Sequence, residues 1–150
     1  MANSQAMCSS FKAELMSGIH ALGATVIRAA ATADAFKAAL YAATATLGAA
    51  TTAYSATGEA TGTNYAAGGI PVPNTSAPSA VGTTGIWTPS GNLVFSNVTI
   101  SNVDAVLIYN STQSNKAVSV HTFGAQTITA GTLTLGMPVN DAANALLRLA

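Results

Sequence analysis

Charged residues are scarce in this chain. Lys and Arg together number 5, Asp and Glu together number 5, and the net charge of the 150 residues is zero. Charged residues are thus 7% of the chain, against about 25% in an ordinary soluble domain. A neutral surface promotes association, so the composition indicates a protein surrounded by its own copies or by partners. The basic residues are too scattered for the basic footprint that nucleic-acid binding requires: Lys12, Arg28, Lys37, Lys116 and Arg148.

Cysteine and long apolar runs are also lacking. Cys8 is the only cysteine, which excludes an intrachain disulfide, and we expect it to be a small, inert, buried side chain. No stretch reaches the roughly 18 apolar residues of a membrane span. The first residues lack the basic and then apolar pattern of a secretion signal. We therefore expect synthesis in the cytoplasm and no contact with a membrane.

Side chains that carry chemistry are few and poorly spaced for it. His20 and His121 have no Cys, His, Asp or Glu at ligand spacing, whereas a zinc site needs about four ligands. A Ser-His-Asp site built on His121 and Asp104 would depend on geometry, and no Gly-x-Ser-x-Gly elbow is present. The glycine-rich segment Gly58–Gly69 lacks the Lys-Ser/Thr ending of a phosphate loop, and we expect its Glu59 to be solvated or at a strand end. The sequence predicts no catalysis, no cofactor and no metal.

The length suits one domain, with a helix at its start. The sequence predicts this helix over residues 4–22, because apolar residues recur there at helical spacing: Phe11, Leu15, Ile19 and Leu22. Gly23 is the expected terminator. We therefore expect residues 1–23 to form an N-terminal arm and helix, and residues 24–150 to form a mainly β domain.

Short alternating segments dominate the second half of the chain. Their spacing of roughly 8–12 residues is typical of a sandwich or barrel, and we expect an antiparallel sandwich or jelly-roll-like domain. The nearly continuous apolar run Asp104–Tyr109 predicts a central strand covered on both faces. The other expected strands are 86–88, 92–100, 116–123 and 126–137.

Three further segments are less regular. Residues 34–41 fit a helix by their alanine content and a strand by their alternation, so both remain open. Ile70–Pro73 is extended, and its two prolines place it at a sheet edge. Residues 74–85 predict an exposed loop, and residues 145–150 a final strand.

Several short segments in a fixed order resemble a known group of proteins. The most specific is Gly58-Glu-x-x-Gly-Thr-x-Tyr-x-x-Gly-Gly69. The others are Ser10–Met16, Phe36–Tyr41, Asp104–Asn110, Val118–Gly124 and Leu146–Ala150, and together these segments span most of the chain. The order is similar to that in small structural proteins of tailed bacteriophages, although this chain is unusually rich in alanine.

The resemblance implies a mostly β virion protein with no enzymatic activity. We expect a capsid decoration, or cement, protein on the capsid surface, whose partners are the major capsid protein and copies of itself. Tail or head–tail connector components are the alternative. A host-glycan binding module on the virion is a further alternative, which an exposed cluster of Trp87 with the tyrosines would favour.

The segment Gly58–Pro78 is the expected contact with a neighbouring subunit. It is long and nearly uncharged, whereas a disordered, solvated tail is usually charged. The N-terminal arm Met1–Ser10 is expected beside it, and Tyr65 is the expected anchor, because interface energy concentrates in buried aromatic residues. The expected interface residues are Tyr65, Ile70, Val72, Met7 and Phe11.

Overall fold

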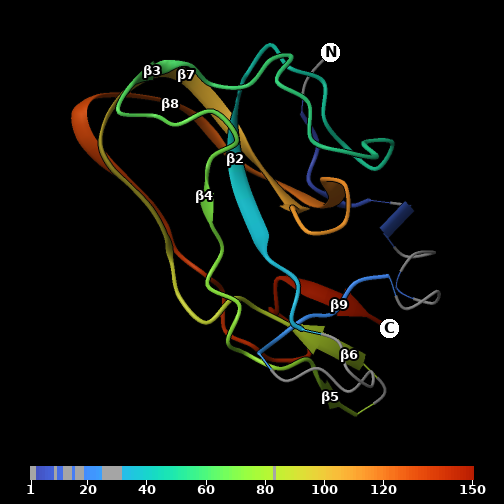
Figure 1. The fold of residues 1–150 in the computed structure, drawn as a ribbon. Coiled ribbons are helices and arrows are strands. Elements are labelled where there is room, and N and C mark those ends of the chain that lie inside the picture. Colours follow the sequence, from blue (N-terminus) through green and yellow to red (C-terminus); the bar gives the residue numbers. More distant parts are fainter. Residues whose placement is uncertain (1–2, 9, 12–14, 16–18, 25–31, 83) are drawn as a thin grey trace.

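The computed structural model describes residues 3–8, 10–11, 15, 19–24, 32–82 and 84–150. These residues form two antiparallel sheets, one of six strands and one of three (Figure 1). The prediction of a mainly β, antiparallel protein is confirmed. No helix in the described part of the chain has the length and hydropathy of a membrane span.

The strands differ greatly in length. Two of them, β7 and β8, have 18 and 20 residues and form a single hairpin. In chain order the strands are β1 (Ala6–Met7), β2 (Phe36–Ala42), β3 (Gly62–Thr63), β4 (Ile70–Pro71), β5 (Ser79–Val81), β6 (Thr84–Trp87), β7 (Leu93–Asn110), β8 (Lys116–Leu135) and β9 (Leu147–Leu149).

The larger sheet has the order β1-β8-β7-β2-β4, with β3 paired to β7. The open alternative at residues 34–41 resolves as a strand, since β2 lies between β7 and β4. Its small residues Ala38 and Ala39 are fully buried, so packing between two strands overrides their preference for a helix. β4 lies at the sheet edge, which confirms the position that its prolines predicted.

The β7–β8 hairpin has two halves. We call 103–110 with 116–123 the central half, and 93–102 with 124–135 the outer half. In the central half β7 is flanked by β2 and β8, and residues 105–110 are all buried. This confirms the prediction of a covered central strand, although the predicted segments on either side join it and form longer strands.

Bulges separate the halves. The register between β7 and β8 shifts at several places between Phe95 and Ala105, and Asn97, Asn102, Gly124 and Ala130 have positive φ there. An extra residue on one strand bends an antiparallel pair and increases its twist. The outer half accordingly curves away from β2 in Figure 1.

The prediction of an N-terminal helix over residues 4–22 is wrong at both ends, because residues 4–8 and 19–22 are not helical. Ala6 and Met7 form β1, which pairs with β8 at Val120 and Ser119. These residues supply a strand because β8 offers unpaired backbone groups on that side. Ser10, Phe11 and Leu15 have helical backbone, residues 19–24 do not, and the remainder of the predicted helix lies outside the described residues.

The smaller sheet has the order β5-β6-β9. Its β9 is the final strand that residues 145–150 predicted. The expected loop at residues 74–85 is largely exposed but contains β5. Trp87 of β6 is buried in the same core as β2 and β7, and its ring lies 6.1 Å from that of Phe36.

Candidate functional site

Glu59 holds the glycine-rich segment together. Its Oε1 accepts hydrogen bonds from the Tyr65 hydroxyl at 2.9 Å and from the Gly68 amide at 2.7 Å, and its Oε2 accepts one from the Tyr54 hydroxyl at 2.6 Å. Glu59 is half-buried and pairs with Tyr41 in an isolated antiparallel bridge, so of the two expectations the strand-end position describes it better than a solvated one. The cause is the fold of the segment, which brings three donors to one carboxylate.

All four tyrosines of the chain gather around this carboxylate. The Tyr65 hydroxyl also accepts the Leu40 amide at 2.9 Å, and the Tyr109 hydroxyl donates to the Gly68 carbonyl at 2.7 Å. The rings of Tyr54 and Tyr109 stack with centroids 4.8 Å apart. We call Glu59 and these tyrosines the tyrosine cluster: Glu59, Tyr41, Tyr54, Tyr65 and Tyr109.

Burial raises the pKa of these phenols above its ordinary value, so they stay protonated well beyond neutral pH. It raises the pKa of Tyr41 to about 12, and it also raises the pKa of Tyr54 and of Tyr65, with Glu59 adding to the shift. A protonated phenol is a hydrogen-bond donor, which is what the Glu59 carboxylate requires. The cluster is therefore a structural brace at neutral pH.

Gly69 brings the segment against β2. Its φ is +72°, and a Cβ placed there would lie 1.8 Å from the Ala38 carbonyl oxygen. Only glycine adopts this conformation and this close approach together. Beyond it the chain enters β4, so the segment that the sequence marked as a contact has a defined path along the sheet.

The expected interface residues have different positions. Phe11 is fully buried and Val72 is 5% exposed, so other residues of the same chain cover both. Tyr65 is half-buried, and its ring stacks on that of Phe95 with centroids 6.1 Å apart. Met7 and Ile70 are half-buried as well. The residues that remain available to a neighbour are therefore Met7, Ile70 and part of Tyr65.

A second buried polar group lies at the start of β2. Asp34 Oδ2 accepts hydrogen bonds from the Ala21 amide at 3.1 Å and from the Asn110 side chain at 2.9 Å. The same Asn110 nitrogen lies 3.0 Å from His20 Nδ1. No local pattern in the sequence indicates this network, because its members are 13 to 90 residues apart.

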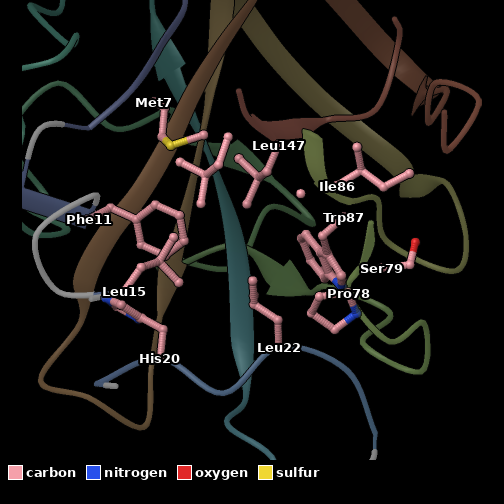
Figure 2. A pocket seen from close by; sticks show the side chains of 12 residues that line it. Met7, Phe11, Leu15, His20, Leu22, Pro78, Ser79, Ile86, Trp87 and Leu147 are labelled. Atoms are coloured by element: carbon pink, nitrogen blue, oxygen red, sulfur yellow. The ribbon is translucent and has the colours of Figure 1, made fainter. Parts of the chain in front are cut away.

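An apolar cavity of about 190 Å³ lies beside this network. Figure 2 shows Phe11, Leu22, Trp87 and Leu147 around it, with His20 at one side. The N-terminal segment, β6 and β9 supply its walls. Since Trp87 is only 1% exposed and Tyr41 and Tyr109 are buried too, these aromatic side chains form no exposed cluster on which a sugar would stack.

His121 of β8 lines a second pocket, together with Leu93, Val106 and Met137. Burial lowers the pKa of His121 to about 4, so its imidazole is neutral at physiological pH. His121 Nε2 lies 2.9 Å from Ser119 Oγ, but that serine is 1% exposed. Asp104 Oδ1 instead accepts a hydrogen bond from the Asn3 side chain at 2.5 Å. His121 and Asp104 therefore have different hydrogen-bond partners and do not form the Ser-His-Asp arrangement considered from the sequence.

Few of the described charged side chains are fully exposed. Among those that the structure describes, Arg148 alone is exposed. The others are buried or half-buried: Asp34, Lys37, Glu59, Asp104, Lys116 and Asp141. The fully exposed residues that the structure describes are consequently almost all uncharged, chiefly Thr, Ser, Asn, Gly and Ala.

Comparison of the chain with protein-family models, with curated proteins and with solved structures finds no match. Within the described ranges, no three His, Cys, Asp or Glu side chains lie together as a metal site would place them. The functional argument therefore depends on the surface and on the residues that shape it.

Proposed function

We propose that this chain is a non-enzymatic structural protein of a tailed-bacteriophage particle, where it decorates the capsid and stabilises the shell. The observation that carries the proposal is the scarcity of exposed charge. Only Arg148 is exposed among the charged side chains described. The sequence resemblance to phage structural proteins supports the choice of particle.

An uncharged surface suits a protein whose work is to be buried against neighbours. Removing a charge from water costs several kcal/mol unless a partner compensates it, whereas hydroxyl and amide groups find partners readily across an interface. A protein that binds the assembled shell but not unfolded chains stabilises that shell by mass action. Burial of uncharged surface is thus the physical basis of the proposed cement function.

Within the expected contact segment Gly58–Pro78, the part Gly58–Pro73 is the proposed contact with the capsid. The tyrosine cluster and Gly69 fix its backbone, so little conformational entropy is lost when it binds. Thr61, Thr63 and Ala67 are exposed along it, and Ile70 is half-buried. In this proposal the two sheets are the layers of a sandwich-like domain that presents the segment on one side.

Copy number in purified particles tests the proposal. We expect hundreds of copies over the shell, counted by quantitative gel analysis and located by cryo-electron microscopy of the phage that encodes the chain. Six or twelve copies at one vertex would identify a tail or connector component instead. Absence from the particle would contradict both.

A charge placed on the segment gives a sharper test. The variant Thr63→Asp buries a carboxylate if the segment meets the capsid, and we expect shell occupancy to fall at least about tenfold, since an unpaired charge at an interface costs several kcal/mol. The control Asn140→Asp adds the same charge at an exposed loop position. Equal occupancy for the two variants would contradict this contact.

A further inference from the structure

The outer half of β8 has an open edge. Among the described residues, β8 pairs with β1 only at Ser119 and Val120, while β7 occupies its other side. From His121 to Leu135 the side away from β7 therefore has no described strand beside it. Figure 1 shows this part of β8 along the outer margin of the molecule. Backbone groups on such an edge point outward and are available to an added strand.

The other edges of the larger sheet are protected. At β4, Pro71 and Pro73 remove backbone donors. The outer edge of β7 pairs with β3 at Thr99 and Ile100, and the Asn64 side chain donates to the Asn97 carbonyl at 2.8 Å. The outer part of β8, from His121 to Leu135, is a long edge that neither prolines nor a paired strand cover among the described residues.

The residues of this edge do not oppose pairing either. From Gln126 to Leu135 the sequence is QTITAGTLTL, with no charge and no proline. Proteins commonly protect edges with lysine, proline or bulges. β8 has no lysine or proline there, and beyond the left-handed residue Ala130 its regular stretch is Gly131–Leu135. Thr132 and Thr134 are exposed on both sides of Leu133, which is 9% exposed and faces inward. Alternating threonine and apolar residues favour an extended strand.

We propose that this edge binds the same edge of a second copy, so that two β8 strands run antiparallel across a twofold axis. The two larger sheets then become one continuous sheet. Such a pair is isologous, which means that one surface patch serves both copies and both open edges close together.

The composition of the edge favours a second copy over another kind of partner. Near a twofold axis each residue meets its own counterpart, so a charged strand would repel itself, whereas the segment from Gln126 to Leu135 has no charge to repel. Threonines facing each other across antiparallel strands form favourable pairs. β1 shows that this side of β8 accepts an antiparallel strand.

This inference deepens the proposed function and rests on it only in that both require copies to assemble. The two are separable. A chain that pairs in solution but never binds capsids would refute the proposed function alone. A chain that decorates capsids without β8 contacts would refute this pairing alone.

Paired lysines test the interface in the full chain. In the variant Thr132→Lys with Thr134→Lys, four positive charges meet at the axis. Like charges facing each other cost several kcal/mol, so we expect the dimer dissociation constant, measured by sedimentation velocity, to rise on the order of 100-fold. The control Thr44→Lys with Thr46→Lys places the same charges, two residues apart, on the exposed turn that follows β2 and leaves the constant unchanged.

Cysteine scanning checks the geometry even if the lysine variant folds poorly. Cys8 is buried, so single cysteines at Gln126, Thr129, Thr132 and Thr134 report the new contact. We expect oxidation to cross-link the position nearest the axis at least tenfold faster than Thr57→Cys on an exposed loop. A wild-type monomer at high concentration, equal dissociation constants for the two lysine variants, or equal cross-linking at all positions would each overturn the pairing.

Discussion

The central and outer halves of the β7–β8 hairpin use the same two strands but differ in what surrounds them. In the central half, β2 and β1 flank the hairpin, and β7 is buried on both faces. In the outer half one face packs inward through Leu93, Phe95 and Leu133, while the other face is exposed. The difference teaches that one pair of strands can be core in one half and can keep an exposed face and an open edge in the other.

The largest expected difference between the halves is in the free energy of unfolding lost when one buried leucine in each half is replaced by alanine. Leu107→Ala in the central half removes a fully buried side chain, and Leu133→Ala in the outer half removes one that is 9% exposed. We expect losses of about 4 and about 2 kcal/mol in the free energy of unfolding, because a cavity costs more where the surroundings cannot relax. Urea denaturation measures both, and equal losses would contradict the comparison.

Glu59→Ala should loosen the outer half selectively. The tyrosine cluster connects the halves, because Tyr65 stacks on Phe95 of the outer half, while Tyr109 of the central half stacks on Tyr54 and donates to the Gly68 carbonyl. Without the carboxylate, the donors on Tyr54, Tyr65 and Gly68 lose their acceptor, and we expect a loss of about 3 kcal/mol.

Hydrogen exchange checks where that stability is lost. We expect amides of residues 93–100 to exchange faster in Glu59→Ala, while those of residues 105–110 keep their protection. The control Glu59→Gln keeps one accepting oxygen and should lose about 1 kcal/mol. Uniform acceleration across both halves would show that the cluster supports the whole sheet equally.

The stability of the folded protein should decrease as the pH is lowered, because His121 is buried in its neutral form. Its folded pKa of about 4 lies below the ordinary 6.5 of the unfolded chain. As pH falls below 6.5, the unfolded chain binds the proton first, so stability present above pH 6.5 is lost on the way to pH 4. We expect this group to cost about 2 kcal/mol between pH 7 and pH 5. Urea unfolding of wild type and of His121→Asn measures it, and identical pH profiles would contradict it.

The smallest expected effects have opposite signs in the two halves. Ala130 in the outer half has a φ of +46°, and Ala130→Gly relieves this left-handed backbone, with a gain of about 0.5 kcal/mol. Ala105 in the central half is fully buried, and Ala105→Gly should cost about 1 kcal/mol. Thermal unfolding compares the two variants, and a loss in both would show that the bulge at Ala130 is not strained.

Some features of this fold were predictable from local chemistry. The alternation after residue 86 predicted the β class, the apolar run at 104–109 predicted a covered central strand, and the prolines near residue 71 predicted an edge. In each case the signal lies within a few residues. The long hairpin was only partly predictable, because bulges interrupt the alternation that would have joined its segments.

The sequence by itself determined the scarcity of charge, the β class and the absence of a disulfide, since composition and side-chain period are local properties. The tertiary structure decided that Ala6–Met7 form a strand, that Glu59 collects three donors, and that Asp34 meets His20 and Asn110. It also decided which strand edge stays open. These features depend on contacts between residues far apart in the chain, and such contacts form only when burial of the common core offsets the entropy of closing the loops between them.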